Sequence, residues 1–432
     1  MAPSEDGPTS ATYATAWLAA QLDAGIPMQN FGSPDWGVTL DAALGMVASG
    51  SGGDQIDAVW SALLVDRDAA VAPGGEDSPG RLARAVLLAV AIGEDPTQVG
   101  AAPGADLVSR LQATRRTVGP DAGLFGSQDA TYDGAFRQGY ALAALVAAGI
   151  TPDPTSVEWL LSQQCGPEAS AGAWMPYRAD LAVPCAFDGD LYVGPDTNAT
   201  SAAITGLSAV GAGGVAVEAG LDWLDSVQEP DGGWAQLAGF GPDPNSTALV
   251  LLSLLAVGAA DEARFADRAA TPLGALLSFQ LGCDSPEADR GAFTFPGSNG
   301  APNGFATAQA VGAAAGAPVL FEPGDVAAGV TPLDCAPAST TTSTTSTTLA
   351  PTTVAPTTLA PTTAAPGTVA PTTAATAPAA VLGTSQGASP TSTAATGLAL
   401  TGTGSRWLAV VGLSAVLSGL LLLAGSRRRG VV

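Results

Sequence analysis

The chain of 432 residues predicts an all-α fold: an (α/α)6 toroid of about twelve helices, a disordered Thr/Pro stalk and one C-terminal transmembrane helix. Two observations predict the ring. First, a turn at residues 228–234 recurs in weaker form after other helical segments. Second, segments that are apolar on all sides alternate with segments that carry charged residues on one face. Repeated helix pairs bury their apolar faces against neighbouring pairs, so the pattern favours a closed array.

Twelve segments have the length of globular helices, and Gly or Pro punctuates nearly every gap between them. Strand signals are scarce. The segments are 10–23, 39–49, 54–65, 80–92, 104–115, 132–148, 154–164, 199–211, 215–228, 246–258, 269–281 and 305–315.

The segments alternate in character, which is why we arrange them as two rings. One set is almost wholly Ala, Leu, Val, Ser and Gly and should be buried on most sides, whereas the other carries charged residues on one face and should contact water. The buried segments then form an inner ring of helices, and the half-exposed segments form an outer ring around it. The buried set starts near residues 39, 135, 199, 246 and 305, and the half-exposed set near 54, 104, 154, 215 and 269.

The best-formed turn reads QEPDGGW, from Gln228 to Trp234, between an amphipathic segment and an apolar run. Its glycines supply positive φ after a helix end, and its glutamine can satisfy carbonyls left open there. We interpret the turn as a structural element and not as a catalytic group. Weaker copies keep the glutamine and replace Trp with Phe or lengthen the loop, at Gln112, Gln164 and Gln280.

Three domains follow from composition. Residues 1–335 form the toroid. Residues 336–397 are Thr, Pro and Ala without a charge, which predicts a disordered, extended linker. Residues 398–432 hold LALTG, an apolar segment at 407–424 long enough to span a bilayer, and a basic tail that would stay in the cytoplasm.

This C-terminal order resembles the cell-wall sorting signal of Gram-positive surface proteins, in its LAxTG variant. The resemblance implies cleavage between Thr401 and Gly402 and attachment of Thr401 to peptidoglycan, with Leu398 and Ala399 completing the sortase site. It also implies a location in the cell wall, at the cell surface, after initial anchoring in the membrane. A plain membrane anchor is the alternative. No signal peptide is visible in residues 1–24.

Charge and composition exclude several functions. Residues 1–335 hold all 39 acidic residues and 11 of the 15 arginines, hence a net charge of −28, which disfavours nucleic acid as a partner. Histidine is absent, so His-based triads and mixed His/Cys zinc sites are excluded. We predict no metal and no cofactor.

The four cysteines contain no CxxC pair, and an even number in an exported protein favours two disulfides. The shorter-loop choice among three connectivities pairs Cys165 with Cys185 and Cys283 with Cys335. Buried free thiols are the alternative.

Gln228, Gly232 and Trp234 match the QxxxGxW motif, and through it residues 10–316 resemble the prenyltransferase and squalene-cyclase repeat superfamily. The resemblance implies that the glutamine closes an outer helix and that the tryptophan packs over it. Class II cyclases of this superfamily use a DxDD-type acid, which neither Asp188–Asp190 nor Asp196–Asn198 reproduces. Cobalamin carriers are similar at the inner-helix starts, but they need a second, β-rich domain.

Short polar residues precede or begin the inner helices and give the candidate ligand rim. They can be N-caps, and they can also converge around one mouth of the ring. Loop aromatics, among them Trp174, either cover that mouth or pack against the turns. The rim candidates are Asp41, Asp133, Asp196, Asn198, Asp243, Asn245, Asn303, Tyr177 and Tyr192.

We therefore expect a cell-wall-anchored surface protein whose noncatalytic toroid binds a small molecule or a surface component. The alternatives are a divergent terpene-cyclase-like or prenyltransferase-like enzyme and a purely structural wall protein.

Overall fold

The computed structural model describes residues 6–100, 106–126, 130–190, 192–318 and 325–335, with the backbone alone at 130–132. The described residues form one compact unit. The predicted linker, the LALTG motif and the transmembrane segment at 407–424 lie outside the described residues. Among the described residues, no helix has both the length and the apolar character needed to cross a membrane.

The described residues are mostly helical, and each of the twelve predicted segments coincides with a helix. Two short helices, α4 (Arg67–Val71) and α12 (Ala263–Ala266), were not predicted. β1 (Gln29–Asn30) pairs antiparallel with β2 (Ser33–Pro34). The predicted helices are α1 (Gly7–Ala24), α2 (Trp36–Ser49), α3 (Gly53–Val65), α5 (Pro79–Ala91), α6 (Leu107–Ala113), α7 (Ala130–Ala147), α8 (Pro154–Ser162), α9 (Thr197–Ala209), α10 (Gly214–Ser226), α11 (Pro244–Val257), α13 (Pro272–Leu277) and α14 (Gly304–Ala314).

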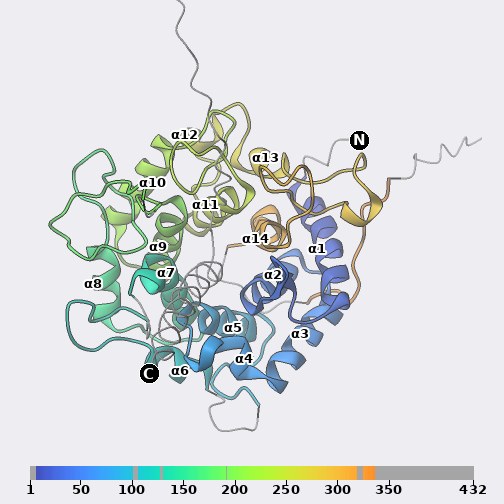
Figure 1. Cartoon of the computed structure of the whole chain (residues 1–432), viewed down its shortest axis with the longest axis horizontal. Helices are drawn as coiled ribbons and strands as arrows, with labels where there is room; N and C mark the ends of the chain where they lie inside the picture. The colour runs from blue at the N-terminus through green and yellow to red at the C-terminus, as the bar shows by residue number, and fades with distance from the viewer. Residues whose placement is uncertain (1–5, 101–105, 127–129, 191, 319–324, 336–432) are drawn as a thin grey trace, which may run out of the picture. The chain divides into compact units, whose positions relative to one another are not determined.

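Six helices form a closed inner ring. In order, α2, α5, α7, α9, α11 and α14 each contact the next, and α14 contacts α2 again (Figure 1). The other long helices lie outside, each against the inner helix that precedes it, as α10 lies against α9 and α8 against α7. This arrangement is consistent with an α/α toroid.

The burial of side chains follows the predicted alternation between helices that are apolar on all sides and helices that are apolar on one face. Every residue of α11 from Pro244 to Leu254 is buried, as expected for a helix that is apolar or small-chained all round. The outer helix α10 buries only Gly220, Leu221, Trp223 and Leu224, which share one face. The apolar core therefore lies between the two rings and between neighbouring inner helices.

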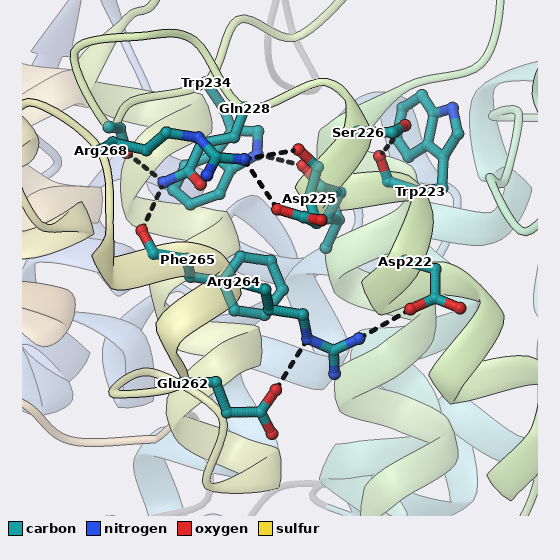
Figure 2. Close-up of polar contacts among 12 residues, drawn as sticks. Asp222, Trp223, Asp225, Ser226, Gln228, Trp234, Glu262, Arg264, Phe265 and Arg268 are labelled. Atoms are coloured by element: carbon teal, nitrogen blue, oxygen red, sulfur yellow. Dashed lines mark hydrogen bonds and ion pairs between the residues drawn. The ribbon is translucent and has the colours of Figure 1, made fainter.

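The turn from Gln228 to Trp234 joins three helices. The Gln228 amide donates to the carbonyls of Gly232 (2.9 Å) and Phe265 in α12 (3.0 Å), and the Trp234 indole donates to Leu224 O at the end of α10 (2.8 Å). Figure 2 shows these bonds, with Arg268 bound to Asp225 beside them. The Trp234 backbone N–H donates to Thr247 Oγ1 in α11 (3.0 Å). The turn is a structural element, and it satisfies carbonyls that the helix ends leave open.

Two of the weaker copies, those of Gln164 and Gln280, keep the same glutamine bonds. Gln164 donates to Gly172 O and Ala216 O, and Gln280 donates to Gly291 O and Ser10 O. The inner-helix threonine recurs too, four residues after the N-cap of its helix, and accepts from the turn backbone. These pairs are Thr39 with Met28, Thr200 with Trp174 and Thr307 with Phe293.

One glycine in each turn allows the next outer helix to approach. Gly172, Gly232 and Gly291 have φ of 88°, 92° and 85°. A Cβ at these positions would lie 2.0–2.4 Å from a backbone carbonyl oxygen of the neighbouring outer segment, so no other residue fits. For Gly291 that segment is α1, and the last turn of the ring therefore docks on the first helix.

The prediction that Gln112 keeps the turn glutamine is wrong. Arg115 pairs with Phe125 as Gln164 pairs with Trp174, and the amide comes instead from Gln138 in α7. Gln138 donates to Gly123 O and Ser156 O and accepts from the Phe125 backbone N–H. It stands where other inner helices carry threonine, and it performs both functions because its longer side chain reaches all three partners.

Two disulfides join Cys165 to Cys185 and Cys283 to Cys335, which confirms the shorter-loop pairing. The first closes the loop between α8 and α9. The second links the loop after α13 to the last described residue of the unit.

Gln138→Thr tests the double role of this side chain. Threonine preserves the acceptor for Phe125 but removes the amide that donates to Gly123 O and Ser156 O, so we expect the free energy of unfolding to fall by about 2 kcal/mol. Urea denaturation measures this. Gln112→Thr, on an exposed position, is the matched control and should change stability by less than about 0.5 kcal/mol. Equal losses in the two variants would contradict the assignment.

Candidate functional site

Three of the predicted rim residues are N-caps of inner helices. Asp196 Oδ1 accepts from the backbone N–H groups of Asn198 (2.7 Å) and Ala199 (2.9 Å) at the start of α9. Asp243 caps α11 through Ser246 N (2.8 Å), and Asn303 caps α14 through Ala306 N (2.9 Å). In both aspartates the second carboxylate oxygen is engaged too, because Asp196 Oδ2 accepts from Gln236 and Asp243 Oδ2 accepts from the Ser246 hydroxyl.

Two rim residues do not lie where the sequence suggested. Asp35 caps α2, and Asp41 stands inside that helix. Asp133 lies inside α7, directly before a break in helical geometry at Gly134. Both aspartates face arginines instead: Arg84 Nε donates to Asp41 Oδ1, and Arg137 Nη1 lies 2.7 Å from Asp133 Oδ1.

The loop aromatics divide into packing and exposed residues. Trp174 is fully buried and donates its indole N–H to Leu160 O (2.8 Å). Tyr177 stacks on Trp159 with ring centroids 6.4 Å apart and bonds Asp121. Tyr192 is exposed. The first two therefore pack the turn between α8 and α9.

A common register on the inner helices explains which side chains meet. Asp41 follows the N-cap Asp35 by six residues, as Arg84 follows Ser78 and Gln309 follows Asn303. Tyr140 lies six residues after the break at Gly134. Asn245 lies two residues after its cap, and positions two and six share a helix face.

These five side chains form what we call the inner-ring polar chain: Asn245, Gln309, Asp41, Arg84 and Tyr140, on α11, α14, α2, α5 and α7 in ring order. Asn245 Nδ2 donates to Gln309 Oε1 (2.9 Å), and the Gln309 amide faces Asp41. Arg84 bonds Asp41, and its guanidinium carbon lies 5.0 Å from the Tyr140 ring centroid. Polar contact thus continues across five adjacent inner helices.

Burial governs the electrostatics of the inner-ring polar chain. It raises the pKa of Asp41, an effect that the Arg84 guanidinium and the Gln309 amide oppose. Burial also raises the pKa of Tyr140 to about 12, so this phenol stays protonated. Within the described structure, the buried atoms Asn245 Oδ1 and Asp41 Oδ2 have no hydrogen-bond donor in bonding geometry. The inner-ring polar chain therefore contains two buried acceptor atoms that a hydrogen-bond donor of a ligand could satisfy.

A second pair of arginines lies one turn nearer the helix starts. Arg137 bonds Asp133, and its buried Nε has no hydrogen-bond partner in the described part of the chain. Arg81 is 3.8 Å from Asp35, and burial lowers the pKa of both arginines. Sequence reasoning missed Arg84, Tyr140, Gln309 and this second pair, although their shared spacing from the helix starts could have revealed them.

Other features of the described residues do not add to this site. No group of three or more potential metal ligands occurs among them. A cleft of about 610 Å³ lies at the opposite ends of α7 and α9, lined mainly by apolar side chains such as Val146, Ile150 and Val210. The polar side chains that line this cleft are Thr151 and Glu158, whereas the buried donors and acceptors described above lie at the helix starts.

Asp196 makes the stability of the ring pH-dependent. Burial raises its pKa to about 6, against hydrogen bonds from Ala199, Gln236 and Asn198 that lower it. The folded-state pKa exceeds the ordinary 3.8, so the folded chain binds more protons between these values. The free energy of unfolding therefore falls as pH rises through this window.

Asp196→Asn keeps a capping oxygen and removes the titration. Between about pH 4 and pH 7, we expect the free energy of unfolding of the variant to rise by about 1–3 kcal/mol relative to that of the wild type. Urea denaturation at each pH measures this difference. Asp153→Asn is the control of opposite sign, because hydrogen bonds from Thr155 lower the pKa of Asp153 at an exposed helix start. Parallel profiles for Asp196→Asn and wild type would refute the role of Asp196.

Comparison with known proteins identifies no family. No protein-family model matches the chain, and no curated protein is significantly similar in sequence. Among solved structures, ent-copalyl diphosphate synthase from Streptomyces platensis is similar with 18% identity and a TM-score of 0.37, over 70% of this chain. The chain spans about half (49%) of that synthase.

A second similar structure is the toroid glycosyl hydrolase UGL in complex with dGlcA-Glc-Rha-Glc. Its identity is 15% and its TM-score 0.48, over 71% of this chain and 95% of UGL. At these identities and scores, neither structure tells us the activity of this chain.

Proposed function

We propose that the toroid is a noncatalytic binding domain that takes a small, hydrogen-bonding ligand at the starts of its inner helices. The inner-ring polar chain supports this most strongly. Five neighbouring inner helices each contribute one polar side chain, of which four are buried and Asp41 is 10% exposed, and Asn245 Oδ1 and Asp41 Oδ2 lack donors in bonding geometry within the described residues. Buried polar atoms are costly when unpaired, so a ligand carrying hydroxyl or amide donors would be stabilised there.

The buried carboxylates already have hydrogen-bond or ion-pair partners in the protein, which favours a binding function over a catalytic one. Asp41 and Asp133 each bond an arginine, and Asp196 and Asp243 each cap a helix. A general acid must hold a proton and deliver it to substrate. The alternative, a divergent terpene-cyclase-like enzyme, draws on the carboxyl groups whose pKa burial raises, Asp41, Asp196 and Asp243.

We further propose that the domain is displayed on the cell surface and is joined to peptidoglycan at Thr401. The order of LALTG, apolar segment and arginines in residues 398–432 supports this. The two disulfides fit an exported protein, because such bonds persist in oxidising compartments.

Native mass spectrometry of the full chain from the producing cell tests ligand binding. We expect a bound small molecule in wild type and its loss in Asn245→Ala, because this change removes a side chain of the inner-ring polar chain. Gln112→Ala, on an exposed position, is the matched control and should retain the ligand. An empty wild-type protein would favour the purely structural alternative, and turnover of the retained molecule would favour the enzyme.

Thr401→Ala tests wall attachment. If sortase joins Thr401 to peptidoglycan, the variant should be absent from the wall fraction that muralytic digestion releases. It should be found in the membrane fraction instead. Thr396→Ala, five residues earlier in the same uncharged segment, should behave as wild type. Equal amounts of Thr401→Ala and wild type in the digested wall would exclude this attachment.

A further inference from the structure

Three exposed aromatic rings gather on two loops outside the inner-ring polar chain. Phe187 and Tyr192 precede α9, and Phe240 precedes α11; they are 47%, 59% and 61% exposed. Ring centroids lie 6.1 Å apart for Phe187 and Tyr192, 5.7 Å for Phe187 and Phe240, and 6.3 Å for Tyr192 and Phe240. We call these residues the aromatic triad. Exposed apolar side chains that contact one another commonly mark a binding surface.

The mutual angles leave ring faces in different directions. The three pairs of ring planes meet at 77°, 61° and 66°. A flat platform for a planar ligand would need similar ring planes, which the triad does not offer. Steeply inclined rings suit a rounded ligand that contacts more than one ring.

Covalent and hydrogen-bonded links fix the loop that carries two of the rings. The Cys165–Cys185 disulfide anchors it just before Phe187. Asp188 and Val193 exchange backbone hydrogen bonds of 2.7 and 3.3 Å, which closes the hairpin around Tyr192. Tyr192 has φ of 52°, a conformation that is costly for a bulky residue. The backbone that carries Phe187 and Tyr192 is therefore tied at both ends of this hairpin.

The charge around the triad favours a cation. Asp188 and Asp190 are exposed in the hairpin between Phe187 and Tyr192. The Arg178 guanidinium, on the same loop, donates to the carbonyls of Gln164, Leu181 and Val183. The folded part as a whole carries 39 acidic residues against 11 arginines, so its field attracts cations. Aromatic ring faces also attract cations through their quadrupole.

We propose that the aromatic triad binds a quaternary or methylated ammonium group, with Asp188 and Asp190 supplying the opposite charge. Such a group is rounded and apolar on its surface yet positively charged, which matches steeply inclined rings beside carboxylates. The acidic hairpin would repel an anionic ligand, and it would give a neutral ligand no net Coulomb attraction. The proposed site is separate from the inner-ring polar chain and does not depend on it.

The test uses the full chain and two probes of the same shape. Choline chloride is titrated at constant ionic strength and followed by saturation-transfer NMR of its methyl groups. Its uncharged isostere, with a tert-butyl group in place of trimethylammonium, is titrated in parallel. We expect the isostere to bind at least about fivefold more weakly, and Phe240→Ser to weaken choline binding about two- to fivefold.

Phe31→Ser is the matched control, because Phe31 is 64% exposed in the turn between β1 and β2. Phe31→Ser should leave the affinity for choline unchanged. Asn245→Ala, in the inner-ring polar chain, should also leave it unchanged, and that result would show that choline binds at the aromatic triad and not at the ligand site proposed above. Equal binding of the two probes would overturn the proposal, since shape and apolar contact would then suffice. Absence of choline binding, or binding of a neutral oligosaccharide in its place, would also overturn it.

Discussion

The ring depends on how each turn satisfies the backbone groups where helices end. A side-chain amide from Gln138, Gln164, Gln228 or Gln280 bridges a turn carbonyl and a carbonyl of the next outer segment. Buried carbonyls cost free energy when unpaired, so these bonds fix the distance between successive outer helices. The turn backbone then donates to the inner helix, to threonine in most repeats. This last bond fixes the rotation of the inner helix, and with it the residues that meet in the inner-ring polar chain.

Local sequence predicted the elements well because the relevant forces act between neighbours along the chain. Periodicity located all twelve helices, and Asp196, Asp243 and Asn303 before apolar runs are caps, as short polar residues at helix starts commonly are. The disulfide pairing followed from loop length, because each cysteine pairs with its nearest partner along the chain.

Residues that act through distant partners were harder to predict. Asp41 resembled a cap because an apolar run follows it, but its role depends on Arg84, which lies on another helix. Gln112 has the expected spacing, yet the working amide is Gln138, which reaches the turn from the following helix. Neither relation is visible before the register between inner helices is known.

The two proposed recognition surfaces rest on opposite physical conditions. In the inner-ring polar chain the polar atoms are buried, and a hydrogen bond from a ligand to Asn245 Oδ1 or Asp41 Oδ2 would replace an unmet one, so the direction of the hydrogen bonds would decide what binds. At the aromatic triad the rings remain in water, and long-range charge with the ring quadrupoles decides instead. An acidic protein can therefore keep arginines inside for one purpose and carboxylates outside for another.

The bond from Gln280 to Ser10 O joins residues 270 positions apart, and Gly291 packs against Tyr13 in the same helix. The first helix, α1, thus lacks its partners α13 and α14 until nearly the whole domain has been made. The ring can therefore close only in a late step of folding, after the carboxy-terminal repeats have been synthesised. Closure also removes the free ends at which open helical arrays fray.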